Sequence, residues 1–241
     1  MTDESLLHVR EWGAGDRTAV LLHGFMGSAD SWWRVGPALA AGGWRVLALD
    51  LPGHGGSPRD PALSVARAAA AVVATVRDRS APAPELAVGH SYGGVVLAAA
   101  RDELRPRRTV LVDAVPRFRG GGDRVELRAR YARDRLARTA DELRRTRPHY
   151  GEQDVRVEVA AAEAFDPDTA AAVASSPDGA WPLPPGAVVV RAAPSTFVTD
   201  DDAASLRRDG VVVRDVAGAA HSVWYSHYDE FMAAICAAVP G

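Results

Sequence analysis

A serine stands at the centre of the stretch Gly89-His90-Ser91-Tyr92-Gly93. This stretch fits the G-x-S-x-G pattern, in which a sharp turn holds a serine hydroxyl clear of the sheet edge so that it can act as a nucleophile. The apolar run Glu85 to Val88 before it indicates a strand, and the alanine-rich segment after it indicates a helix. Side chains in place of the two glycines would collide where strand and helix pass close together. The sequence therefore predicts a nucleophilic Ser91.

The elements that must position this serine alternate along the chain. Helices are expected at 29–39, at 62–77, directly after the serine and at 228–239. Apolar runs that indicate strands occupy residues 6–12, 18–22, 45–49, 85–88, 109–112, 187–191 and 211–216. Strands that alternate with helices predict an α/β fold with a mostly parallel sheet covered on both faces. A length of 241 residues suits one such domain with a small insertion.

The pattern changes between residues 116 and 185. From Asp123 to Arg147 one long helix is expected, because apolar residues recur three or four positions apart: Val125, Ala129, Ala132, Leu136, Ala140 and Leu143. Shorter helices are expected at 155–164 and 168–174, with no strand among them. We interpret residues 1–115 and 186–241 as the core domain, and residues 116–185 as a helical lid inserted in it, lying over the strand ends.

Four segments, in this order, resemble the α/β-hydrolase superfamily. They are His23 to Gly27, Asp50 to Ser57, the turn at Ser91, and Gly218 to Val223. The resemblance covers the chain except for the proposed lid, and it implies the α/β-hydrolase fold. It says little about the substrate, because this fold hosts esterases, thioesterases, acyltransferases, lyases, dehalogenases and hormone receptors.

The resemblance assigns chemical roles to particular positions. Ser91 is similar to the family's nucleophile and His221 to its general base, which agrees with the need of a serine hydroxyl for an imidazole that takes its proton. The backbone N–H groups of Phe25 and Tyr92 are expected to form the oxyanion hole, which stabilises the charge that develops on the carbonyl oxygen.

The acid that would orient His221 is not where most relatives have it. After the strand 187–191 those relatives carry an Asp, but this chain continues with Ala192-Ala193-Pro194-Ser195-Thr196. Asp113, which follows the preceding strand, is one candidate, although an Asp at such a place is also common as a loop anchor. One of Asp200 to Asp202 is a second candidate, although this cluster is equally typical of a helix start. A Ser-His dyad without an acid is the third alternative.

Three tryptophans are candidates for substrate contact, namely Trp32, Trp181 and Trp224. Each is a common core residue as well, since indole rings bury a large apolar area. Together, near the mouth of one pocket, they favour an aromatic or bulky apolar acyl group.

The proposed lid is rich in arginine. From Pro116 to Tyr150 there are eleven arginines against five acidic residues, although the whole chain has a net charge of −3. Arg-acid pairs on a solvated helix face explain this in one interpretation. In the other, the lid faces an acidic partner such as a phosphopantetheine-bearing carrier protein or coenzyme A phosphates, with Arg128, Arg135 and Arg138 as contact positions.

The composition of the chain argues against several kinds of partner and cofactor. The net charge of −3 argues against a nucleic-acid partner. Neither a signal peptide nor an apolar run of membrane-spanning length is evident, so we expect a cytoplasmic protein without a membrane partner. Histidines and acidic residues show no metal-ligand spacing, and no cofactor is expected.

The function most consistent with these features is serine-dependent acyl chemistry on an ester or thioester, as in an esterase, thioesterase or acyltransferase. The acyl group would be carrier-bound in a biosynthetic pathway if the lid has an acidic partner. One alternative is a lyase like those of the menaquinone pathway, which use the same serine and histidine. Another is a non-catalytic ligand-binding protein of the same fold.

Overall fold

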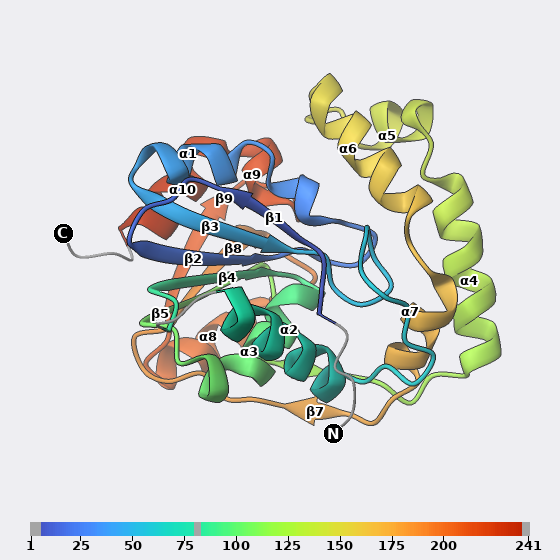
Figure 1. Ribbon diagram of the computed structural model, residues 1–241, viewed down its shortest axis with the longest axis horizontal. Helices are drawn as coiled ribbons and strands as arrows, with labels where there is room; N and C mark the ends of the chain where they lie inside the picture. Colours follow the sequence, from blue (N-terminus) through green and yellow to red (C-terminus); the bar gives the residue numbers. More distant parts are fainter. Residues whose placement is uncertain (1–5, 80–82, 238–241) are drawn as a thin grey trace.

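The computed structural model describes residues 6–79 and 83–237. A seven-stranded sheet in the order β1-β3-β2-β4-β5-β8-β9 forms its centre (Figure 1). Only β1 (Val9–Trp12) is antiparallel to its neighbour, and the remaining strands run parallel: β2 (Arg17–Leu22), β3 (Trp44–Leu49), β4 (Leu86–His90), β5 (Arg108–Val112), β8 (Val188–Ala193) and β9 (Val212–Ala217). The predicted α/β-hydrolase fold with a mostly parallel sheet is confirmed.

Helices cover both faces of the sheet (Figure 1). On one face lie α1 (Val35–Ala41), α9 (Val223–Ser226) and α10 (Tyr228–Cys236), and on the other α2 (Val65–Arg79), α3 (Tyr92–Leu104) and α8 (Asp200–Arg208). The helix expected at 29–39 is divided into a 3-10 turn, η1 (Ala29–Trp32), and α1. Central strands covered on both faces are buried throughout, which explains their uninterrupted apolar sequences.

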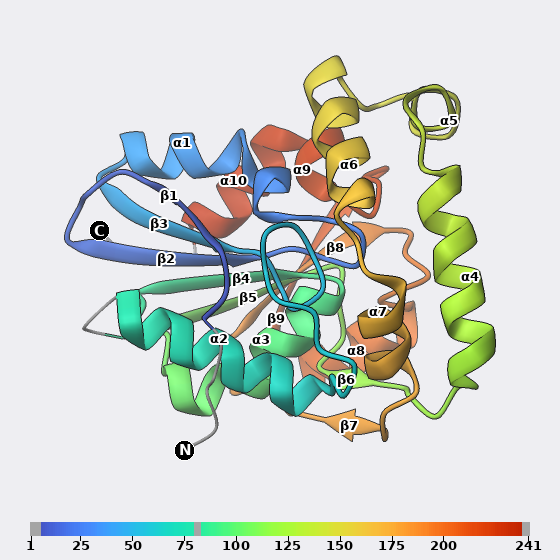
Figure 2. The same ribbon diagram turned by 45° about the vertical axis from the view of Figure 1, so that its right-hand side comes forward.

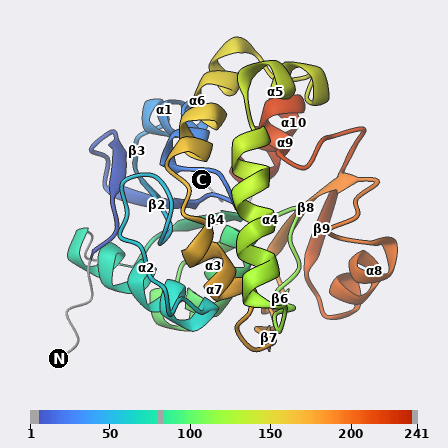
Figure 3. The same ribbon diagram turned by 90° about the vertical axis from the view of Figure 1, so that its right-hand side faces the viewer.

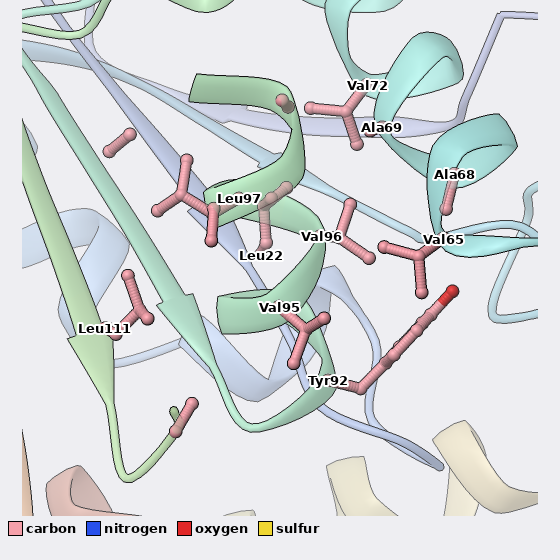
Figure 4. Packing of buried hydrophobic residues seen from close by; sticks show 14 of the residues in the cluster. Leu22, Val65, Ala68, Ala69, Val72, Tyr92, Val95, Val96, Leu97 and Leu111 are labelled. Atoms are coloured by element: carbon pink, nitrogen blue, oxygen red, sulfur yellow. The ribbon is translucent and has the colours of Figure 1, made fainter. Parts of the chain in front are cut away.

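The packing of α3 fixes the start of this helix against the sheet. Val96 on α3 and Val72 on α2 are completely buried between the two helices and the strands (Figure 4). A Cβ atom on Gly94 would lie 2.7 Å from the Cβ of Ala114, so α3 approaches the end of β5 more closely than a side chain permits. This close packing holds the turn that precedes α3 in one place.

The segment between β5 and β8 contains four helices beyond the carboxyl ends of the parallel strands (Figures 2 and 3). They are α4 (Arg124–Ala137), α5 (Ala140–Thr146), α6 (Glu152–Glu163) and α7 (Pro167–Ala174). We call residues 116–185 the insertion. Within the described ranges, no helix has both the length and the apolar character needed to cross a membrane.

One expectation about the insertion was wrong, and two further features were not predicted. The single helix from Asp123 to Arg147 is two helices, because the Thr139 side chain accepts a hydrogen bond from the Glu142 N–H and caps a new helix there. The apolar stripe does not face the core: Val125 is 78% and Leu136 75% exposed, since α4 packs on α7 through the face that carries Tyr131. Two short strands that were not expected, β6 (Arg117–Phe118) and β7 (Gly179–Ala180), pair at the base of the insertion.

Candidate active site

Ser91 occupies the turn between β4 and α3 in a strained backbone conformation. Its φ is 51° and its ψ −119°, values that non-glycine residues rarely adopt. A Cβ atom on Gly89 would lie 2.4 Å from the carbonyl oxygen of Gly93, and one on Gly93 would lie 2.4 Å from that of His23. The collisions expected from the sequence are therefore present, and both positions require glycine.

His221 and Asp113 form a hydrogen bond at the carboxyl ends of the strands. The distance from His221 Nδ1 to Asp113 Oδ2 is 2.7 Å. Because an ionised carboxylate only accepts hydrogen bonds, this contact places the proton of the neutral imidazole on Nδ1 and leaves Nε2 as a base. His221 and Ser91 line the same pocket.

Hydrogen bonds of both its backbone and its side chain hold Asp113 in place. Its side chain is 1% exposed and its φ is 44°. The Asp113 N–H donates to Val190 O at 2.7 Å, and its Oδ1 accepts from the Ala192 N–H at 3.3 Å. Ala192 belongs to the stretch where an Asp was expected from the resemblance. In this protein that stretch carries no acid, and its Ala192 N–H instead supports the carboxylate of Asp113 after β5.

The acidic cluster Asp200 to Asp202 lies in the first turn of α8 and forms other contacts. Thr199 caps this helix, Asp202 pairs with Arg117 at 2.6 Å, and Asp200 pairs with Arg191. The interpretation as a helix start therefore accounts for the cluster. Within the described part of the chain, no three His, Cys, Asp or Glu side chains are grouped so that they could hold a metal ion.

A second buried aspartate, Asp50, organises the loop before the site. Its Oδ1 accepts from the Ala29 N–H at 2.6 Å, and its Oδ2 from the Gly56 N–H at 2.8 Å. His23 donates through Nδ1 to Gly24 O at 2.8 Å and accepts at Nε2 from a backbone N–H, so it is neutral. Burial lowers the pKa of His23 in agreement with this role.

Phe25 and Tyr92, the two expected oxyanion-hole residues, lie side by side. Their rings stack with centroids 4.3 Å apart, and Phe25 lines the pocket. Tyr92 begins α3, so its N–H is one of those at the start of a helix that have no partner within the helix. An anionic oxygen near this N–H would also benefit from the helix dipole.

His90 supports the backbone of His221. Its Nε2 donates to His221 O at 3.0 Å, and its ring lies edge-on to Trp224. Burial, and then the neighbouring His221, lower the pKa of His90 well below its usual value. A neutral His90 can remain a donor to this carbonyl while His221 changes its protonation state.

The pocket has a volume of about 430 Å³ and an aromatic wall made of Phe25, Phe197 and Trp224. Phe197 was not predicted; its ring stacks on His221 with centroids 3.7 Å apart. Of the three tryptophans expected in the pocket only Trp224 lines it. Trp32 is completely buried against Trp224, and Trp181 packs on the core, because large indole rings fill the gaps between helices and sheet.

The insertion contributes polar side chains to the pocket lining. Arg138 forms an ion pair with Glu158. Glu158 Oε1 also accepts from the hydroxyls of Ser31 and Tyr225, each at 3.0 Å. Sequence reasoning missed Glu158, because a single acidic residue on a helix gives no sign of which distant residues it will meet.

Comparisons with known proteins agree with this fold. The profile of the alpha/beta hydrolase family matches residues 19–234. A pimeloyl-[acyl-carrier protein] methyl ester esterase from Edwardsiella ictaluri is 30% identical over 253 residues, which cover 93% of each chain. The dihydrolipoyllysine-residue acetyltransferase component of an acetoin cleaving system from Cupriavidus necator is 38% identical over 115 residues, which are 47% of this chain and 29% of that protein. The crystal structure of a bromoperoxidase from Bacillus anthracis shares the fold with a TM-score of 0.77 at 19% identity, covering 95% of this chain and 94% of that one.

Proposed function

This chain is a hydrolase of the alpha/beta hydrolase family, and we propose that it cleaves an ester or thioester with Ser91 as the nucleophile. The observation that carries the proposal is the 2.7 Å hydrogen bond between His221 and Asp113 in the pocket that Ser91 lines. A serine on a strained turn, an imidazole and a buried carboxylate are the three groups that acyl transfer through a serine requires.

In this mechanism Ser91 Oγ attacks the carbonyl carbon while His221 Nε2 takes the hydroxyl proton. The imidazolium that results is stabilised by Asp113, whose carboxylate is held by the Ala192 N–H and needs no rearrangement. The carbonyl oxygen becomes negatively charged and accepts hydrogen bonds from the N–H groups of Phe25 and Tyr92.

The tetrahedral intermediate then collapses, and the bond to the alcohol or thiol breaks. His221 Nε2 returns its proton to the leaving group, and an ester between the acyl group and Ser91 remains. Water attacks this ester while His221 Nε2 takes one of its protons. His221 then returns that proton to Ser91 Oγ as the bond to the acyl group breaks and the acid leaves. An acceptor alcohol or amine in place of water would make the same site an acyltransferase.

The test is intact-mass analysis after treatment with a fluorophosphonate, for the wild type, Ser91→Ala and His221→Ala. We expect one covalent adduct on the wild type, none on Ser91→Ala, and slow labelling of His221→Ala. Turnover of aryl and alkyl thioesters should fall by about 10⁴-fold or more in Ser91→Ala. Ser205→Ala, on the exposed face of α8, is the matched control and should label normally.

Other outcomes separate the alternatives. Labelling of Ser91 without turnover of any ester or thioester would favour the lyase. No labelling of the wild type, together with tight binding of a ligand, would favour the non-catalytic binding protein.

The proposal also covers the kind of acyl group that is cleaved and the partner that carries it. Rings of Phe25, Phe197 and Trp224 along one wall support an aromatic or bulky acyl group. The outer face of α4 supports an acidic carrier protein, because Arg130 and Arg133 are exposed and have no ion pair within the described residues.

The three arginines first chosen as contact positions are less suitable for testing a carrier. Arg128 pairs with Asp168, Arg135 donates to a backbone carbonyl, and Arg138 pairs with Glu158. Charge reversal at Arg130 and Arg133 is the better experiment. It should lower turnover of a carrier-bound thioester by about tenfold and leave hydrolysis of a small ester unchanged. Equal effects on both substrates would contradict carrier docking at this face.

A further inference from the structure

One wall of the pocket carries a charge that the proposed hydrolysis does not use. Arg138 follows the end of α4 and lines the pocket together with Ser91 and His221. Its guanidinium pairs with Glu158, whose side chain is 5% exposed. A buried ion pair adds little stability compared with apolar side chains of similar volume, because both charges lose their hydration. A role other than folding therefore explains the pair better.

Glu158 acts as a fixed support for the guanidinium. One carboxylate oxygen accepts from the hydroxyls of Ser31 and Tyr225, and the other contacts Arg138. Both oxygens are thus engaged by the protein. The two hydroxyls belong to η1 and α9, so Glu158 joins the insertion to the core and holds Arg138 in a fixed place relative to it.

Arg138 keeps hydrogen-bond donors that the protein does not use. Within the described residues its hydrogen bond goes to Glu158 alone, and its Nε is buried without a partner. A guanidinium offers several further N–H groups in one plane. Burial lowers the pKa of Arg138, but Glu158 together with Tyr150 and Tyr225 raises it by more, so the net shift is upward and the group stays charged.

The charge balance of the pocket is positive. Arg138 and Arg147 both line it, and Glu158 is the single carboxylate among the described lining residues. In the described part of the chain, Arg147 has no carboxylate within ion-pair distance; it donates to a backbone carbonyl. Burial, and then Arg147, lower the pKa of His149, so this lining histidine is neutral near pH 7. The lining side chains therefore present an excess of positive charge to an anion, while the Asp113 carboxylate is buried behind His221.

We propose that Arg138 binds a carboxylate of the substrate while Ser91 attacks the scissile carbonyl. This inference rests on the proposed function and narrows it: the substrate is an ester or thioester that also carries a negative charge, in its acyl chain or in its alcohol. The planar fork of an arginine matches a carboxylate with two parallel hydrogen bonds. The aromatic wall then holds the apolar part of the same substrate.

The experiment compares esters that differ only in this charge. The first pair is 4-nitrophenyl hemiglutarate and its neutral carboxamide analogue, which places the charge in the acyl chain. The second pair is 4-acetoxybutanoate and 4-acetoxybutanamide, which places it in the alcohol. In one of the two pairs, wild-type enzyme should cleave the charged ester with a kcat/KM about tenfold higher or more. Glutarate should inhibit at lower concentration than glutaramide.

The variants assign the preference to Arg138. Replacing both partners, Arg138→Gln with Glu158→Gln, avoids leaving an unpaired buried carboxylate, and it should bring the ratio of the two kcat/KM values close to one. Arg138→Lys should retain part of the ratio, because it keeps the charge and loses the fork. Arg144→Gln on α5, outside the pocket lining and paired with Glu152, is the control and should keep the full ratio.

Three results would overturn the inference. Equal kcat/KM values within both pairs for the wild type would show that charge is not recognised. An unchanged ratio in the double variant would place recognition elsewhere. A loss of activity on charged and neutral esters alike would mean that the pair only supports the pocket wall. If no ester is cleaved and Ser91 does not label, the proposed function itself fails and the inference falls with it; normal labelling and turnover without preference reject the inference alone.

Discussion

The loops that carry Ser91, Asp113 and His221 are held by the sheet, whereas the insertion that carries Arg138 is held by side chains that meet across the chain. Ser91 and Asp113 directly follow two neighbouring strands, and both have positive φ values. Their places are determined by a few backbone hydrogen bonds. Arg138 instead depends on Glu158, and Glu158 depends on hydroxyls from two helices of the core.

This difference separates two kinds of structural information. A strained turn demands glycine at particular positions, so it leaves a pattern that can be recognised in the sequence. A contact between an arginine and a glutamate twenty residues away leaves none, because either side chain alone is typical of an exposed helix. Residues of the turns at the strand ends can therefore be recognised in the sequence, whereas a contact such as that between Arg138 and Glu158 cannot.

Apart from the loss of Ser91 or His221 themselves, the largest effect should come from Asp113→Asn. Losing the carboxylate removes the acceptor that fixes the His221 tautomer, so kcat should fall by about 10⁴-fold with little change in folding. Asp200→Asn is the matched control, because Asp200 is 92% exposed and pairs with Arg191 away from the pocket. Steady-state kinetics on a thioester checks both variants. If Asp113→Asn kept more than half of the activity, a dyad would be the better description and the sheet-held triad would be abandoned.

The acid illustrates how much of the site the sequence determines. Ser91 and the alternation of strands with helices follow from local patterns, His221 follows from the family resemblance, and the structure brings Asp113 to His221. The sequence left three alternatives for this acid open, because it does not show which strand end lies next to the histidine loop. The register of β5 with β8 does so, since it sets Val112 beside Val190 and Asp113 directly beyond.

The insertion was less predictable for a different reason. Helices were expected there, although α4 and α5 were expected as one. The buried face of α4 was not predicted, because alanines and single apolar residues occur on both sides of this helix. Only the packing partner α7 decides which side is buried. Phe197 likewise lies in a loop whose sequence gives no reason to expect a ring stacked on His221.

A smaller effect is expected on the free energy of unfolding at acidic pH. It should arise mainly from buried histidines in the loops at the strand ends. Burial, and then His23, lower the pKa of His54 from 6.5 to about 3. Between these values the unfolded chain binds a proton that the folded chain does not. Stability is therefore complete above pH 6.5 and falls as the pH decreases, by up to about 1.4 kcal/mol per pH unit for each such histidine.

His54→Gln tests this origin. Urea unfolding at pH values from 7 to 4.5 should show a slope smaller by about one proton than that of the wild type, even if the variant is less stable at pH 7. His149→Gln in the insertion is the comparison, because this histidine is half-buried and its partial exposure limits the shift. A steeper slope for His54→Gln, or the same reduction in both variants, would contradict the assignment to the strand-end loops.

The smallest effect is expected on the outer face of α4. Val125→Ser with Leu136→Ser should change the free energy of unfolding by no more than about 0.5 kcal/mol, because both side chains are already exposed to water in the folded protein. Tyr131→Ser on the opposite face should cost about 3 kcal/mol, since Tyr131 is 9% exposed and packs against Phe25 and Phe165. Urea unfolding of the three proteins measures the difference. A large loss in the double variant would mean that the apolar stripe is covered in solution, and the insertion would then be held by contacts beyond those within one chain.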